Sequence, residues 1–272
     1  MNQNLRGIGI DFISVFGLPP IQFVALAAEL GCQHISVALT PMPGNPLDYP
    51  LWSLRDDARL RKELIAALSD HGITLSLGEG FLIRPGTDIR AAAGDMELMR
   101  ELGVPSINIV PIDPDWARSI EQLSLFAAMA AANGLGATLE YMPGMRIGDL
   151  PTAVAAVREV DNPNLRLLID AMHLFRSGAG TTDLAALPPE MIGYVQLCDV
   201  PVISKHASYA DEARYYRLSP GEGELPLQHF IDALPRDLMV GLEVPMLNEA
   251  QAGIGPYERL AKCVEAARVL LG

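Results

Sequence analysis

Short apolar runs alternate along the chain with longer amphipathic segments. The short runs are typical of buried strands, and the longer segments of helices that rest one face on a core. Prolines 19 and 20 open one helical segment, and Gly72 closes another. We predict eight strands, at residues 7–11, 35–39, 74–77, 106–110, 137–140, 165–170, 192–197 and 238–242.

Helical segments follow these strands in strict alternation. We predict them at residues 20–31, 54–69, 88–102, 116–133, 150–160, 183–187, 227–234 and 257–271. Eight alternating units in about 250 residues have the size of a (β/α)8 barrel. We therefore expect an α/β fold, a TIM barrel, with residues 1–272 as a single domain. A doubly wound open sheet is the alternative, but its glycine-rich phosphate-binding fingerprint is absent after the first strand.

Four of the predicted strands end in an oxygen-bearing side chain. These residues are Glu140, Asp170, Gln196 and Glu243. In a closed parallel barrel such strand ends meet at one face, where the chemistry takes place. Because side chains alternate along a strand, these four point into the barrel and the residues just before Glu140, Asp170 and Glu243 point outward. The pattern predicts a site for one divalent cation.

Two further carboxylates, Asp11 and Glu79, also follow predicted strands. For these we expect ordinary helix-capping or salt-bridge roles. The longest connection, residues 199–225, carries the cationic and aromatic residues Lys205, Tyr209, Arg214 and Arg217 in an otherwise acidic protein. Long connections of this kind often act as lids or specificity elements, and we expect this one to contact the substrate.

Composition and charge exclude several classes of function. Half of the residues are hydrophobic, so a large core is available, and the formal charge of −13 opposes binding to nucleic acid. Three widely spaced cysteines without a CxxC pair favour a reduced, cytoplasmic setting. The uncharged stretch 122–139 is interrupted by glycines 134 and 136, so we expect no membrane span. Residues 1–6 lead directly into a strand, so we expect no secretory segment.

Five short motifs, most of them at strand ends, resemble those of one known family. They are LEYMP at 139–143, IDAMH at 169–173, YVQLCD at 194–199, PGEGE at 220–224 and LEVP at 242–245. Together they resemble the sugar phosphate isomerase/epimerase family of xylose isomerase-like TIM barrels. The resemblance extends over the whole chain, and the second half carries the specific motifs.

The resemblance implies a metal ligand set and catalytic roles. Glu140, Asp170, Gln196 and Glu243 would hold one divalent metal ion, and Glu140 and Glu243 would also be the catalytic acid/base pair. His173 and Arg217 would bind the substrate. Gln196 stands where histidine is commoner and resembles the bacterial 3-dehydroshikimate dehydratases. Four oxygen donors favour Mn²⁺ or Mg²⁺, with Co²⁺ or Zn²⁺ as the other candidates.

The implied reaction is a metal-dependent isomerisation or epimerisation in carbohydrate metabolism. A proton is removed next to the carbonyl of a keto-sugar or related polyol ketone, through a metal-stabilised enediolate. The alternative is a lyase of the 3-dehydroshikimate dehydratase type, which loses water after the same first step. An apurinic endonuclease-like phosphodiesterase and a non-catalytic sugar-binding barrel are further alternatives. The resemblance also implies a homo-oligomer, either a dimer or a tetramer.

Overall fold

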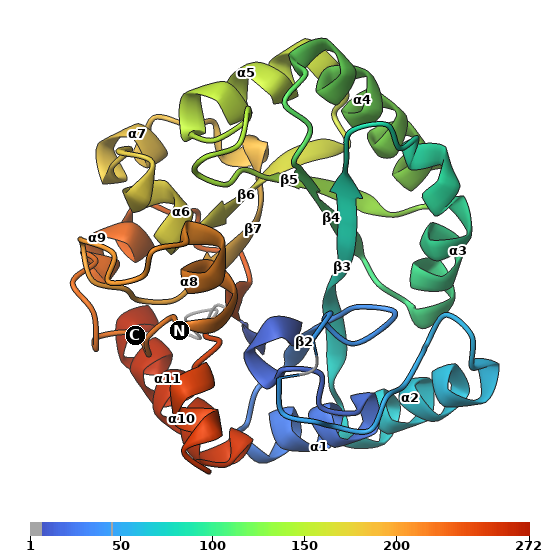
Figure 1. Ribbon diagram of the computed structural model, residues 1–272, viewed down its shortest axis with the longest axis vertical. Coiled ribbons are helices and arrows are strands. Elements are labelled where there is room, and N and C mark those ends of the chain that lie inside the picture. The colour runs from blue at the N-terminus through green and yellow to red at the C-terminus, as the bar shows by residue number, and fades with distance from the viewer. Residues whose placement is uncertain (1–6, 45) are drawn as a thin grey trace.

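Eight parallel strands close into a barrel, and helices surround it on the outside (Figure 1). The computed structural model describes residues 7–44 and 46–272. Each strand pairs with the next one along the chain, and the last pairs with the first, which confirms the predicted TIM barrel. The strands are β1 (Ile8–Ile10), β2 (His34–Val37), β3 (Thr74–Ile83), β4 (Ser106–Pro111), β5 (Gly136–Glu140), β6 (Leu165–Asp170), β7 (Ile192–Leu197) and β8 (Val240–Leu242).

The helices include all the predicted segments and three that were not predicted. They are α1 (Pro20–Glu29), α2 (Ala58–His71), α3 (Ala93–Leu102), α4 (Trp116–Ala132), α5 (Leu150–Val160), α6 (Ala171–Arg176), α7 (Thr181–Ala185), α8 (Tyr209–Tyr215), α9 (Leu227–Asp232), α10 (Leu247–Gln251) and α11 (Pro256–Leu271). Short 3-10 helices lie at η1 (Phe12–Val15), η2 (Ile89–Ala92) and η3 (Pro189–Met191). The unpredicted α6, α8 and α10 lie in connections that follow β6, β7 and β8, on the side of the barrel where the polar strand ends lie.

Local chemistry explains where the regular helices begin and end. The Asp57 carboxylate accepts hydrogen bonds from two backbone amides at the start of α2, and Gly72 ends that helix in the left-handed conformation. Asp149 and Thr152 form a capping box at the start of α5. These caps satisfy backbone groups that a helix end leaves without partners, so the boundaries follow from short sequence signals.

The hydrophobic core has two separate parts. The large cluster fills the space between strands and helices and includes Leu139, Ile169, Leu197 and Leu242, which confirms their predicted outward direction. A small cluster of Leu77, Leu168 and Tyr194 packs inside the barrel. Since the interior cluster lies two residues before the polar strand ends of β6 and β7, the barrel has an apolar filling below a polar mouth.

The third strand is longer than its sequence pattern indicates. β3 continues from Thr74 to Ile83, with a shift of its register against β4 between Gly78 and Phe81. Gly80 lies in this irregular part with a φ of 101°, a conformation that glycine adopts without a steric penalty. Glu79 is therefore inside the strand and not at its end.

No helix within residues 7–44 and 46–272 is both long and apolar enough to cross a lipid bilayer. The uncharged stretch that raised this question divides between α4 and β5, as predicted. The expectation of no secretory segment concerns residues 1–6, which lie outside the described residues.

Candidate active site and metal centre

The four predicted strand-end residues lie on four adjacent strands, β5 to β8. Glu140 pairs with Leu168 of β6, Asp170 pairs with Gln196 of β7, and Gln196 pairs with Gly241 of β8. All four side chains are buried, with Gln196 completely so. Glu243 follows β8 directly, and its amide donates to Leu197 O at 3.1 Å. Their neighbouring positions follow from the barrel register, and their roles as ligands stay predictions.

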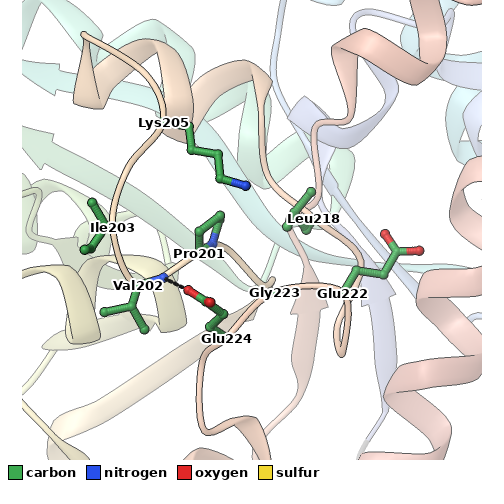
Figure 2. Close-up of a pocket in the computed structure, with 8 residues that line it drawn as sticks. All are labelled: Pro201, Val202, Ile203, Lys205, Leu218, Glu222, Gly223 and Glu224. Carbon is green, nitrogen blue, oxygen red and sulfur yellow. Dashed lines mark hydrogen bonds between the residues drawn. The ribbon is translucent and has the colours of Figure 1, made fainter.

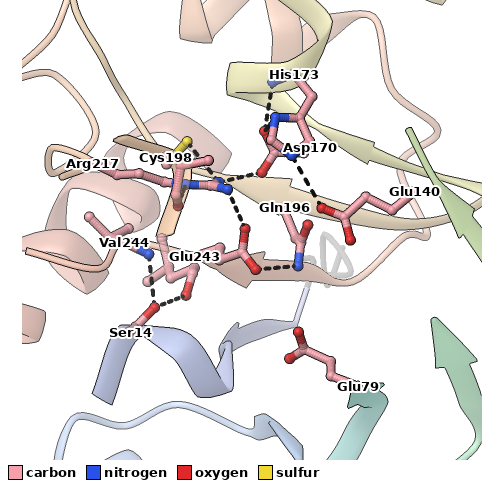
Figure 3. Close-up of polar contacts among 12 residues, drawn as sticks. Ser14, Glu79, Glu140, Asp170, His173, Gln196, Cys198, Arg217, Glu243 and Val244 are labelled. Carbon is pink, nitrogen blue, oxygen red and sulfur yellow. Dashed lines mark hydrogen bonds and ion pairs between the residues drawn. The ribbon is translucent and has the colours of Figure 1, made fainter. Parts of the chain in front are cut away.

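Arg217 forms the centre of the contacts among these residues (Figure 3). Its guanidinium makes an ion pair with Asp170 and a second one with Glu243, where Nη2 lies 2.7 Å from Oε2. It also donates to the backbone oxygen of Ala213 at 2.7 Å and to the Cys198 sulfur at 3.4 Å. Arg217 is only 3% exposed. The sequence motif predicted a substrate contact for this residue, and the structure adds two carboxylate contacts.

The pKa values of the two carboxylates shift in opposite directions, although Arg217 lowers both of them. Burial pushes the pKa of Asp170 upward, but the charge of Arg217, with further help from His173, brings it below its usual value. Burial, together with the charges of Glu140 and Asp170, raises the pKa of Glu243 in spite of Arg217. Of these two carboxylates, Asp170 is therefore the one that ionises at the lower pH.

Glu140 is oriented by neighbours on both sides. Asn108 of β4 donates its amide to Oε2 at 2.5 Å, and His173 Nε2 lies 3.4 Å from Oε1. His173 is in turn anchored, because its amide donates to Asp170 at 2.8 Å and its Nδ1 lies 2.6 Å from the hydroxyl of Tyr209. Tyr209 belongs to α8, so the long connection after β7 helps to orient the predicted substrate-binding histidine.

Gln196 and Glu243 are linked, and the backbone around Glu243 is held by a serine. Gln196 Nε2 donates to Glu243 Oε1 at 2.9 Å, while its own Oε1 is buried without a partner. Ser14 donates its hydroxyl to Leu242 O at 2.9 Å and accepts from Val244 N at 2.8 Å. Ser14 therefore contacts the chain on both sides of Glu243 (Figure 3). No local signal in the sequence pointed to this contact.

The expected capping or salt-bridge roles of Asp11 and Glu79 are wrong. Asp11 is fully buried, its side chain makes no cap, and the hydroxyl of Tyr194 donates to it at 2.9 Å. Glu79 accepts a hydrogen bond from the Ser36 hydroxyl. Asp11 comes directly after β1, whereas Glu79 lies inside β3. Burial is the main cause that raises the pKa of Asp11 to about 7 and that of Glu79 to about 8.

The donor atoms at the barrel mouth suit a hard divalent cation. Five carboxyl groups gather there, and Arg217 supplies the permanent positive charge. The buried Gln196 Oε1 and Asp11 Oδ2 have no partner among the described residues. Oxygen donors of this kind are the ligands that Mg²⁺ and Mn²⁺ prefer. The five groups are Asp11, Glu79, Glu140, Asp170 and Glu243.

The side chains at the barrel mouth are not arranged around a single metal position. Within residues 7–44 and 46–272, no three His, Cys, Asp or Glu side chains are arranged as a metal site. One of the four predicted ligands is a glutamine, and Arg217 contacts two of the others. The residue types and the unpartnered oxygens therefore fit the ion. The side chains themselves are arranged around Arg217, which pairs with Asp170 and Glu243.

A pocket of about 400 Å³ opens beside Glu140. Glu79, Glu140 and Asn108 line its polar part, and Phe12 and Phe81 are among its apolar residues. A second pocket, of about 700 Å³, is formed by the connection after β7 and is lined by Val202, Ile203 and Lys205 among others (Figure 2). The second pocket contains none of the predicted site residues. Of these two pockets, the one beside Glu140 is therefore the candidate substrate site.

Known proteins are similar in sequence to about half of this chain. The 3-dehydroshikimate dehydratase of Pseudomonas aeruginosa is 29% identical over 154 residues, which cover 54% of this chain and 24% of that protein. The D-psicose 3-epimerase of Ruminiclostridium cellulolyticum is 26% identical over 178 residues, 56% of this chain and 57% of that protein. The matched part is thus about a quarter of the dehydratase and little more than half of the epimerase.

A solved structure and a family profile extend the similarity to nearly the whole chain. The structure of the IolI protein with a bound zinc atom superposes with a TM-score of 0.80 at 16% identity, covering 97% of this chain and 98% of that one. At this identity it shows the fold alone. The profile of the xylose isomerase-like TIM barrel family matches residues 24–264. By this match, the chain belongs to the xylose isomerase-like TIM barrel family.

Proposed function

We propose that this chain is a divalent-metal-dependent isomerase or epimerase of a keto-sugar or related polyol ketone. The observation that carries the proposal is the placement of Glu140 and Glu243. Both are buried at the ends of strands that border the same barrel mouth, and Glu140 lines the pocket beside it. Isomerisation next to a carbonyl needs one group that removes a proton from carbon and one that returns it.

The ligands in this proposal are Glu140, Asp170, Gln196 and Glu243, and Mn²⁺ or Mg²⁺ is the expected ion. When bound, the ion stabilises the negative charge that develops on the substrate oxygens after deprotonation. The unpartnered Gln196 Oε1 and the excess of carboxyl groups at the barrel mouth support this assignment. The family includes metal-dependent sugar isomerases, epimerases and dehydratases, so the general requirement for an ion is consistent with its relatives.

The side chains divide the proton transfers between them. Glu140 removes the proton, since it reaches the pocket and Asn108 holds one of its two oxygens in place. Glu243 returns the proton, since it is buried at the end of β8 on the same barrel mouth. His173 orients a substrate oxygen, and Tyr209 fixes its ring.

A dehydratase is the second candidate, and Glu79 favours it. Loss of water begins with the same proton removal, but then the bond from carbon to a β-hydroxyl breaks, and the departing hydroxide needs a proton. Glu79 lines the same pocket as Glu140 and has its pKa raised to about 8 by burial, so at neutral pH it carries a proton that it can donate. The similarity to 3-dehydroshikimate dehydratases adds support.

Proton exchange tests both candidates. The purified chain with MnCl₂ is incubated in D₂O with D-fructose, D-psicose or D-tagatose, and proton NMR follows the loss of the signal next to the carbonyl. We expect exchange on at least one ketose, its loss in Glu140→Gln, and its retention in Glu97→Gln, a control on the exposed face of α3. In parallel, 3-dehydroshikimate is followed by ultraviolet absorbance. The proposal would be refuted if no ketose exchanged its proton and 3-dehydroshikimate showed no absorbance change.

A further inference from the structure

The pocket beside Glu140 has opposite charges at its two ends. Glu140 is a buried carboxyl group and Glu79 a half-buried one, and three exposed arginines line the same pocket: Arg55, Arg84 and Arg214. Arg84 comes directly after β3, and Arg214 belongs to α8 in the connection after β7. The two elements are far apart in the sequence, so the barrel brings their cationic side chains to one opening.

Only one of these three arginines is neutralised. Arg55 makes two hydrogen bonds to the carboxylate of Asp95, at 2.8 and 2.7 Å. Within residues 7–44 and 46–272, the guanidinium groups of Arg84 and Arg214 have no carboxylate partner, and Arg214 instead lies 5.9 Å from the ring centroid of Tyr215. Acidic residues outnumber basic ones by 33 to 20 in this chain. Arg84 and Arg214 therefore give this side of the pocket two positive charges that no carboxylate among the described residues neutralises.

The chemistry of guanidinium determines what such an opening attracts. Arginine presents a planar set of donors that matches two oxygens of a carboxylate or phosphate at once. A neutral polyol gains little from these charges, whereas an anion gains both hydrogen bonds and electrostatic attraction. In the same pocket, the carboxylate of Glu140 repels an anionic group. An anionic substrate would thus bind in one orientation, with its charged end outward and its ketone toward Glu140.

We propose that the substrate carries an anionic group, a carboxylate or a phosphate, which Arg84 and Arg214 bind at the mouth of this pocket. The proposal rests on the proposed function, because it takes the pocket beside Glu140 as the substrate site. It specifies the substrate class as an acidic polyol ketone in place of a neutral keto-sugar.

Calorimetric titration with three ketones of similar size tests this. D-fructose is neutral, 5-keto-D-gluconate carries a carboxylate, and D-fructose 6-phosphate carries a phosphate. We expect at least one anion to bind the wild-type chain about tenfold more tightly than D-fructose. Arg84→Gln and Arg214→Gln should each remove most of that preference, measured as the ratio of the anion and D-fructose affinities. Comparison of the two anions identifies which group the site takes.

Arg158→Gln is the matched control. Arg158 is an exposed arginine of α5 outside the pocket, and its substitution removes the same unit of charge. The proposal predicts an unchanged preference in this variant. Circular dichroism and thermal melting verify that all three variants fold. Equal binding of D-fructose and both anions, no measurable binding of either anion at millimolar concentration, or the same loss in Arg158→Gln would overturn the proposal.

The binding experiment separates this inference from the proposed reaction. An anion preference that depends on both arginines, without proton exchange on any ketone, would refute the proposed function and leave the anion site in place. Proton exchange on D-fructose without any anion preference would retain the proposed function and refute the anion site.

Discussion

Arg217 and Asp170 form an ion pair in which both side chains are almost completely shielded from water, with relative exposures of 2% and 0%, although 47 residues separate them in the chain. The same guanidinium pairs with Glu243. One arginine from the connection after β7 thus joins the ends of β6 and β8. The same connection also supplies Tyr209 and Arg214, both in α8. Through Arg217, the predicted ligands Asp170 and Glu243 therefore contact this connection directly.

Replacing Arg217 by methionine should strongly destabilise the metal-free protein. Two buried carboxylates would lose their counter-charge, and removal of one partner of a buried ion pair costs about 3–5 kcal/mol. Urea denaturation in the presence of EDTA measures this loss. Arg59→Met is the control, because the Arg59–Glu63 pair is exposed and its loss should cost far less stability. Equal losses in the two variants would contradict the central role of Arg217.

The stability of the metal-free chain should fall as the pH rises from 5 to 8. Asp11 and Glu79 keep their protons in the folded protein up to about 7 and about 8, whereas in the unfolded chain they ionise near their ordinary values of 3.8 and 4.5. Their contribution to the free energy of unfolding is complete below the pKa values of the unfolded chain. It is lost as the pH rises through the pKa values of the folded protein. Glu79→Gln should flatten this decline, and Glu97→Gln should not. An unchanged slope in Glu79→Gln, measured by urea denaturation at several pH values, would contradict the burial argument.

Ser14→Ala should reduce both stability and activity. It leaves the buried amide of Val244 without its acceptor and frees the backbone next to Glu243. A buried group left without a partner costs about 1–3 kcal/mol. In the control Ser124→Ala, the lost bond is a hydroxyl contact to Ile120 O within α4, and the change should stay within about 0.5 kcal/mol. Chemical denaturation and the proton-exchange rate are the measurements, and an unaffected rate would exclude a positioning role for Ser14.

Gln196→Ala should weaken the binding of Mn²⁺ at least about tenfold. The substitution removes the buried amide oxygen and also the 2.9 Å hydrogen bond that orients Glu243. Calorimetric titration with MnCl₂ gives the dissociation constant without any need for a substrate. Gln228→Ala, on the exposed side of α9, is the matched control and should bind as the wild type does. Unchanged affinity in Gln196→Ala would remove this residue from the ligand set.

The barrel and the gathering of the four strand-end residues could be predicted from short patterns. Strand positions followed from apolar runs, and the inward direction of Glu140, Asp170 and Gln196 followed from the two-residue period of a strand. The core supports this alternation, because Leu139 and Ile169 pack outward against the helices. A period is a local property, so it can be recognised without knowing which distant segments touch.

The true positions of Asp11 and Glu79 could not be predicted in this way. Glu79 lies inside a strand that continues past an irregular register at Gly80, and this irregularity depends on pairing with β4. Asp11 meets Tyr194, a residue 183 positions away. A strand-end carboxylate that caps a helix and one that enters the barrel look alike in the sequence, because the difference arises from contacts made only after closure.

By itself, the sequence determined the closed α/β barrel and the side of it on which the oxygen-bearing residues lie, since both follow from local periodicity and from the alternation of strands and helices. Only the tertiary structure decided which charges meet. It placed Arg217 between Asp170 and Glu243, and it left Arg84 and Arg214 unpaired at one pocket. Such pairings depend on loops that bring together residues far apart in the chain, and electrostatic partners are set by distance in space and not by order along the sequence.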